Sequence, residues 1–151
     1  MLLRARREAL EGCPTLVGHI VHLCCMQFRA ARHTNDLKAI TEFYTKVGLQ
    51  VLGSFEDHDG YNGVFLGMPG ESWHLEFTQS EDAAQHMPDA DDLLVLYPAT
   101  RAGYEAIRQR IADAGLSLLK AQNPYWQRHG LHVADPDGFG VVISDQRCTN
   151  A

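Results

Sequence analysis

The sequence lacks paired cysteine motifs and concentrated clusters of basic residues. Its four cysteines, Cys13, Cys24, Cys25 and Cys148, do not show the C-x-x-C spacing of a zinc site, and this usage suggests a reducing cytoplasm. The 13 Lys and Arg residues are outnumbered by 19 Asp and Glu residues, which gives a formal charge of −6. Because nucleic-acid binding relies on clustered basic side chains, we expect a small-molecule partner and no nucleic acid.

Motifs for covalent catalysis and phosphate binding are also missing. No Gly-x-Ser-x-Gly sequence is present, and the glycines between 60 and 70 are not followed by the Gly-Lys-Ser/Thr of a phosphate-binding loop. The segment 135–138, Asp-Pro-Asp-Gly, places two carboxylates close together but lacks the later ligands of an EF-hand. We therefore predict a tight hairpin turn there and no calcium site.

An internal repeat is the most informative feature that the chain does contain. Five residues recur at a constant offset of 67, where composition alone gives roughly one identity. They are Ala39, Ile40, Gly48, Leu49 and Leu52, which return as Ala106, Ile107, Gly115, Leu116 and Leu119. With 151 residues, 45% hydrophobic and 21% charged, the chain is predicted to form one domain and not to span a membrane. Its two modules are expected to bury each other's apolar faces.

Each module is predicted to have the order βαβββ. In module one, strands are expected at 28–34, 49–55, 61–66 and 73–78, with a helix that Asn35 or Asp36 caps and Gly48 ends. In module two, strands are expected at 93–97, 116–120, 131–134 and 139–144, with a helix over 100–114 and a long loop through 123–126. The domain covers 27–145, with module one at 27–79, a polar linker at 80–91 and module two at 92–145. An extension (1–26) and a tail (146–151) flank it.

The N-terminal extension differs in character from the rest of the chain. Arginines at positions 4, 6 and 7 precede a mildly apolar stretch over 15–26, which His19 and His22 interrupt. A secretory signal peptide is disfavoured, because its apolar region is more hydrophobic and ends in a small-residue cleavage site. A loosely attached helix over 3–10 is the preferred interpretation, and a natural start at Met26 is an alternative.

Three segments of the chain resemble the vicinal oxygen chelate superfamily, which includes glyoxalase I, bleomycin-resistance proteins and extradiol dioxygenases. They are TNDLKAITEFYTKVGLQVLG (34–53), HLEFTQ (74–79) and HVADPDGFGVVI (132–143). The segments HDGY (58–61), HLEFT and NPYW (123–126) are similar to a small glyoxalase-like branch. The resemblance covers about residues 27–145 and implies an α+β fold. In it, tandem βαβββ modules form a curved mixed sheet around a cleft, with the helices on the convex side. The cleft lies within one chain or across a homodimer.

The resemblance also implies where a metal would bind. The superfamily's metal enzymes place one ligand on the first strand and one on the last strand of each module. By resemblance these positions are Arg29, Glu76, Asp92 or Leu93, and Val142. Arginine has no lone pair to offer a metal, and valine has no donor atom at all. We therefore expect no cofactor, and a divalent metal held by replacement ligands such as His74 is the alternative.

The candidate catalytic residues are Glu76 and His74. Strand alternation places both on one face of the predicted strand 73–78, while Trp73, Leu75 and Phe77 point to the core. A buried Glu76 carboxylate without a metal needs a cationic partner, and the Arg29 guanidinium can bind it through two hydrogen bonds. Alternatively, Arg29 binds an anionic ligand.

The predicted ligand-binding residues are drawn from both modules: Arg29, His58, Tyr97, Asn123, Tyr125 and Trp126. For His58 and Trp126, turn formation and loop anchoring are equally open interpretations. The preferred hypothesis is a protein like those of the bleomycin-resistance branch, which binds a small molecule in the cleft between its two modules without the usual metal. The alternative is a metal-dependent lyase or isomerase of the glyoxalase type that uses Glu76 with non-standard ligands.

Overall fold

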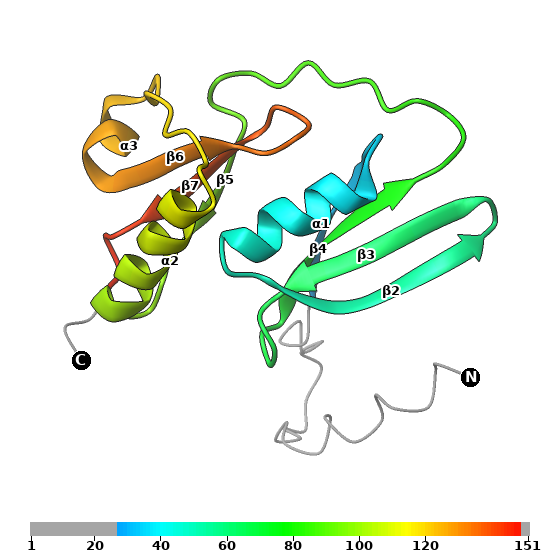
Figure 1. Cartoon of the computed structure of the whole chain (residues 1–151), viewed down its shortest axis with the longest axis horizontal. Coiled ribbons are helices and arrows are strands. Elements are labelled where there is room, and N and C mark those ends of the chain that lie inside the picture. The colour runs from blue at the N-terminus through cyan, green and yellow to red at the C-terminus, as the bar shows by residue number, and fades with distance from the viewer. Residues whose placement is uncertain (1–26, 149–151) are drawn as a thin grey trace, which may run out of the picture.

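The computed structural model describes residues 27–148 (Figure 1). Its elements are, in chain order, β1 (Phe28–His33), α1 (Leu37–Lys46), β2 (Gln50–His58), β3 (Tyr61–Gly67), β4 (Trp73–Gln79), β5 (Leu93–Leu96), α2 (Arg101–Asp113), α3 (Pro124–His129), β6 (Gly130–Ala134) and β7 (Gly140–Ser144). The helix expected over 3–10 lies outside the described residues. Within 27–148, no helix is long and apolar enough to cross a membrane.

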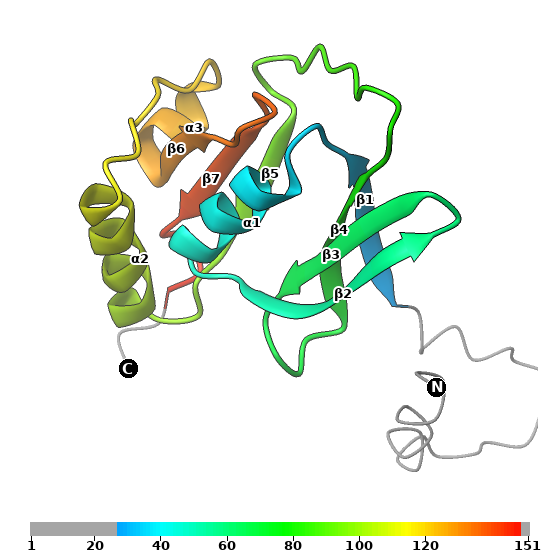
Figure 2. The ribbon, with the colours of Figure 1, turned by 45° about the vertical axis from the view of Figure 1, so that its right-hand side comes forward.

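The strands form two mixed sheets. The first sheet has the order β1-β4-β3-β2, and the second has the order β5-β7-β6. In each sheet one parallel pair, β1 with β4 or β5 with β7, adjoins an antiparallel pair. Figure 2 shows α1 between the two sheets, with α2 beside it. The α+β class and the tandem modules are therefore confirmed.

The repeat is visible in how the two helices end. Asp36 caps α1, because its side chain accepts a hydrogen bond from the Ala39 N–H. The C-caps Val47 of α1 and Ala114 of α2 are separated by the same offset of 67. Each is followed by a glycine with positive φ, Gly48 at 111° and Gly115 at 65°, a conformation that glycine adopts without strain.

Module two departs from the predicted order in one region. Residues 116–120 form no strand and donate one backbone hydrogen bond to the neighbouring strand, from Leu119 N to His132 O at 2.7 Å. The expected strand is wrong: Leu116 packs against the core, but the consecutive Leu118 and Leu119 remain 59% and 45% exposed, so the segment buries too little apolar surface to form a strand. The expected loop at 123–126 is also wrong, since Asn123 caps α3 and Pro124 begins it.

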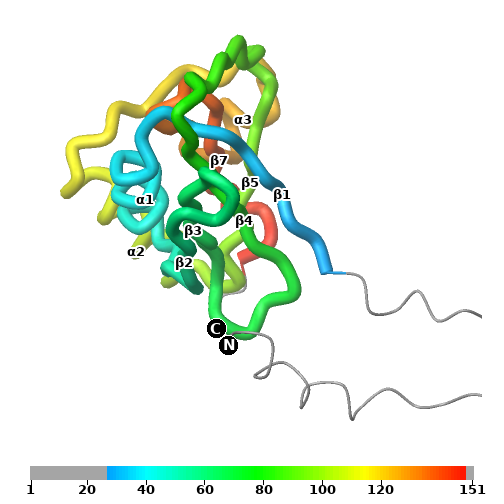
Figure 3. Tube along the Cα trace, turned by 90° about the vertical axis from the view of Figure 1, so that its right-hand side faces the viewer, coloured from blue at the N-terminus to red at the C-terminus, as the bar shows by residue number. Residues whose placement is uncertain are grey.

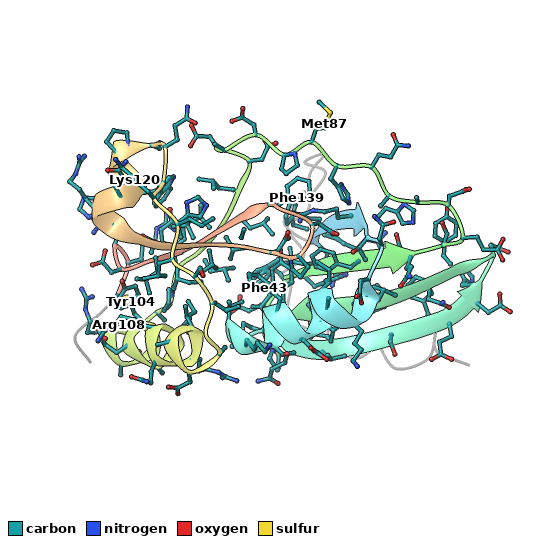
Figure 4. All side chains as sticks on the ribbon, turned by 45° about the horizontal axis from the view of Figure 1, so that its top comes forward. Phe43, Met87, Tyr104, Arg108, Lys120 and Phe139 are labelled. Carbon is teal, nitrogen blue, oxygen red and sulfur yellow. The ribbon has the colours of Figure 1, made fainter. Side chains whose placement is uncertain are left out.

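The Asp-Pro-Asp-Gly segment forms the tight turn that was predicted, and it also joins the modules. Asp135 Oδ1 accepts hydrogen bonds from the N–H groups of Asp137 and Phe139. Its other oxygen, Oδ2, lies 2.6 Å from Arg32 Nη1 and 2.8 Å from the Tyr44 hydroxyl, both in module one. Burial and the Asp135 carboxylate raise the pKa of Tyr44, so its hydroxyl stays protonated and donates. The Arg32 guanidinium lies 3.6 Å above the centre of the Phe139 ring, near the β6–β7 turn in Figure 4.

The linker between β4 and β5 runs along the edge of the molecule and is held by both modules (Figure 3). The Asn35 side chain donates to Ala84 O at 2.9 Å and accepts from Ala84 N at 2.8 Å. The His86 ring packs edge-on against Phe139, with their centres 5.3 Å apart. Met87 is 97% exposed and points away from the fold (Figure 4). The linker is therefore anchored at two points.

Candidate functional site

Strand alternation on β4 places its polar and apolar side chains on opposite faces. Leu75 and Phe77 are 5% and 1% exposed and belong to the core beneath α1. His74 and Glu76 therefore lie on the other face, as predicted. The parallel register pairs Arg29 with His74, so β1 contributes Arg29 to that same face. We call the side of the first sheet that is turned away from α1 the outer face.

An ion pair occupies the outer face. Arg29 Nη1 lies 2.6 Å from Glu76 Oε2, which places side by side two residues that are 47 positions apart in the sequence. The Arg29 side chain is 55% exposed, whereas that of Glu76 is 12% exposed. Oε2 is buried and receives no hydrogen bond of good geometry within the described part of the chain. Arg29 therefore balances the Glu76 charge while keeping guanidinium donors available to a ligand.

Four ring side chains form a row across the same sheet, and we call them the ring row. His58 packs against Phe55, Phe55 against Phe65, and Phe65 against His74, with ring centres 6.0, 5.8 and 5.4 Å apart. A Cβ atom at Gly63 would clash with the Phe55 ring as it lies here, so glycine at this position leaves room for that ring. The ring row offers a flat apolar surface next to the ion pair.

His33 is a residue of this face that the sequence analysis missed. It follows Arg29 by four positions on β1, so both side chains lie on one face. Its Nε2 lies 3.2 Å from the Ser80 hydroxyl, and its ring centre lies 6.2 Å from that of Tyr61. Strand alternation along β1, of the kind that separated the two faces of β4, would have placed His33 on the same face as Arg29.

The residues at the superfamily's metal positions do not fit a metal. Glu76 is matched by Arg29, and Val142 is fully buried in β7 beside α3. His132 pairs with Val142 in register, but burial lowers the pKa of this histidine and its Nδ1 has no hydrogen-bond partner among residues 27–148. Across those residues, no three His, Cys, Asp or Glu side chains come together as metal ligands. Ligand binding without a metal therefore stays a prediction, which rests on the lack of suitable donor atoms at Arg29 and Val142.

The other predicted site residues lie elsewhere in a single chain. Tyr97 follows β5 at the seam between the modules, with the Arg147 guanidinium 4.6 Å from its ring centre. The Asn123 side chain caps α3, where Tyr125 packs against Trp126. The structure thus brings Arg29, His58, His74 and Glu76 to the outer face and keeps Tyr97 and α3 apart from them.

Comparisons with known proteins identify the family of the chain. Residues 28–78 match the YycE-like N-terminal domain, and residues 91–145 match the YycE-like C-terminal domain. The protein YycE of Bacillus subtilis is 37% identical over 123 residues, covering 80% of this chain and 88% of that protein.

Solved structures extend the comparison to the fold. A crystal structure of a YycE protein from Bacillus subtilis, for which a glyoxalase or fosfomycin-resistance role has been suggested, superposes with a TM-score of 0.72. It shares 35% identity and covers 84% of this chain and 93% of its own. Glyoxalase I of Leishmania major has a TM-score of 0.60 at 18% identity, covering 79% of this chain and 85% of its own. The resemblance to the vicinal oxygen chelate superfamily is confirmed, and the chain belongs to the YycE-like family within it.

Proposed function

We propose that this protein binds a small acidic molecule on the outer face without the superfamily's usual metal. The observation that carries the proposal is the Arg29–Glu76 ion pair beside the ring row. A flat apolar group can lie on the rings of Phe55 and Phe65, while an acidic group takes the exposed donors of Arg29. His74 stands between these two parts, and its ring nitrogens can donate or accept a hydrogen bond at the bound group. Sequestration of such a molecule in the cytoplasm is the proposed role.

A second copy of the chain is proposed to cover the site. The modules of one chain pack through α1, so the outer face is left open and Arg29 is 55% exposed. A cleft that excludes water strengthens an ion pair between ligand and guanidinium, because the local dielectric constant falls. Tyr125 and Trp126, which a single chain keeps away from Arg29, can contribute from the second copy. Sedimentation velocity tests this part, with a dimer expected.

Phenylphosphonate is a suitable probe because it joins one flat ring to one acidic group. In two-dimensional NMR spectra, we expect it to shift the amide signals of β1, β3 and β4, including those of Arg29, Phe65 and His74. Arg29→Met should abolish the shifts, whereas Arg108→Met, which removes an exposed arginine of α2, should leave them unchanged. Shifts confined to other elements, or shifts that survive Arg29→Met, would show that the proposed site is wrong.

An enzyme is the second candidate, favoured by one specific observation. Apart from its ion pair with Arg29, the buried Glu76 Oε2 atom receives no hydrogen bond of good geometry among residues 27–148, so it can accept a proton once a substrate displaces the guanidinium. The activity would be that of a glyoxalase-type lyase or isomerase, supported by a divalent metal with non-standard ligands. Incubation with a hemithioacetal of a 2-oxoaldehyde, with and without added Ni²⁺ or Zn²⁺, tests this. Turnover that Glu76→Gln abolishes would favour the enzyme over the binding protein.

A further inference from the structure

A largely apolar groove runs along the seam between the two modules, on the α1 side of the first sheet. Its first part is a cavity of about 350 Å³ whose lining includes Phe28 and Leu75 of module one and Leu94 of β5. Its second part is a cavity of about 560 Å³ whose lining includes Ala106 and Ile107 of α2. Trp73, Leu96 and Tyr97 line both cavities, so the two parts adjoin. Each part has the volume of a typical ligand site.

Several of the apolar side chains that line the groove are exposed to solvent. Phe28, Met68 and Tyr97 are 65%, 40% and 40% exposed, and all three line it. Exposed apolar side chains that gather in one concave place mark a binding surface more often than scattered ones do. Arg29 and Glu76 lie on the opposite face of the first sheet, so this groove is separate from the proposed site.

The charges at the groove favour an acidic ligand. Arg110 of α2 lines the groove, and Arg147 lies over the ring of Tyr97. Neither arginine forms an ion pair with a carboxylate among residues 27–148, although Arg101 and Arg108 nearby do. The one carboxylate of the lining, Glu71, belongs to the module-one wall. Module two therefore places Arg110 in the lining and Arg147 at the margin over Tyr97, and neither has an ion-pair partner among residues 27–148.

We propose that the seam groove binds a medium-chain fatty acid, with the acyl chain against Trp73, Leu96 and Tyr97 and the carboxylate at Arg110 or Arg147. A flexible chain can follow two cavities that adjoin at shared residues, which a rigid ring system cannot do. Burial of the chain against aromatic and aliphatic walls provides the driving force. A guanidinium binds the carboxylate through two parallel N–H donors, which selects an acid over an alcohol.

Trp73 reports directly on this groove, because the chain has two tryptophans and Trp126 can be replaced. In a Trp126→Phe background, titration with decanoate below its micelle concentration should change the Trp73 emission and reach saturation. Decanol should bind several-fold more weakly, and a double variant, Arg110→Gln with Arg147→Gln, should remove that difference. An absence of saturable binding, or equal affinity for decanol and decanoate in the parent protein, would overturn the proposal.

Two alanines of α2 provide a matched pair of variants. Ala106 is exposed within the groove, so Ala106→Phe fills the channel and should weaken decanoate binding at least about tenfold. Ala112 is exposed on another face of α2 and does not line the groove, so Ala112→Phe should leave the affinity within about twofold. Equal effects of the two substitutions would contradict the assignment.

Two further results would assign the groove or the ligand differently. If Ala106→Phe changes the sedimentation coefficient of the ligand-free protein and Ala112→Phe does not, a second copy covers the groove and the fatty-acid proposal fails. If Arg29→Met abolishes decanoate binding, the acid occupies the outer face instead. We expect neither result, because Arg29 lies on the other side of the sheet and the groove lies within one chain.

Discussion

Arg32 of β1 and Asp135 of the β6–β7 turn are 103 positions apart in the sequence, and their side chains meet at 2.6 Å. The Asp135 side chain is fully buried and that of Arg32 is 18% exposed. Two backbone N–H groups and the Tyr44 hydroxyl also donate to the same carboxylate. This contact fixes module two against the first sheet, so the seam groove, which residues of both modules line, depends on it.

Removal of this arginine should strongly destabilise the fold. Arg32→Met leaves the buried Asp135 carboxylate without its cation, which should lower the free energy of unfolding by about 3–5 kcal/mol. The exposed arginine Arg108, which pairs with Glu105, provides the control, and Arg108→Met should cost less than about 0.5 kcal/mol. Urea denaturation measures both values. Similar small losses would mean that the Arg32–Asp135 contact does not join the modules.

The Arg29–Glu76 pair should behave as a half-exposed pair. Because Arg29 is 55% exposed, Arg29→Met should cost about 1–2 kcal/mol, between the values for surface and buried pairs. Glu76→Leu should cost a similar amount, and the double variant less than the sum of the two. Thermal melts of the three variants give the coupling energy. Strictly additive losses would show that the two charges are independent.

His132 should make the protein sensitive to acid. Burial lowers the pKa of His132 in the folded state below its unfolded value of about 6.5. The contribution of neutral His132 to the stability of the fold is therefore fully present above pH 6.5. It is lost as the pH falls from 6.5 through the pKa of His132 in the folded state. His132→Leu should flatten the decrease in Tm between pH 7 and 5, whereas His58→Leu, at an exposed position, should not. Equal slopes for the parent protein and His132→Leu would contradict this account.

Residues 1–25 are predicted to be dispensable for folding. The matched family domains begin at residue 28, and β1 begins at the same residue. A chain that starts at Met26 should keep the Tm of the full chain within a few degrees. Insoluble product, or a large decrease in Tm, would show that the extension contributes to the core.

Local sequence signals predicted the parts of the fold that depend on neighbouring residues. Asp36 before an amphipathic segment marked the start of α1, and Gly48 and Gly115 marked two helix ends. The alternation of residues 73–78 separated Leu75 and Phe77 from His74 and Glu76 before the sheet was known. Combined with the resemblance, this placed Arg29 opposite Glu76. The Asn123-Pro124 start of α3 is an equally local signal, because Asn caps a helix and Pro favours its first position, although a loop was expected there.

Other features depend on contacts that no local pattern contains. Nothing around Arg32 indicates that it, and not Arg29, binds the distant Asp135, since both arginines lie on one strand. The arginine that binds Asp135 is the one on the face of β1 that module two covers. That face is set by tertiary packing and not by the local sequence. The seam groove arises in the same way, from Trp73 and Tyr97 in different modules. The segment 116–120 does not form a strand because only the first of its three leucines finds a surface to pack against, while Leu118 and Leu119 stay exposed.

Elemental analysis of the purified protein tests the central claim most directly, because the account has Arg29 balance the Glu76 charge in place of a metal. The protein should be prepared without chelators and without a metal-affinity tag. We predict far less than one divalent metal ion per chain, and the same content in the Glu76→Leu variant. One tightly held nickel, zinc, iron or manganese ion per chain, lost in Glu76→Leu, would contradict the account.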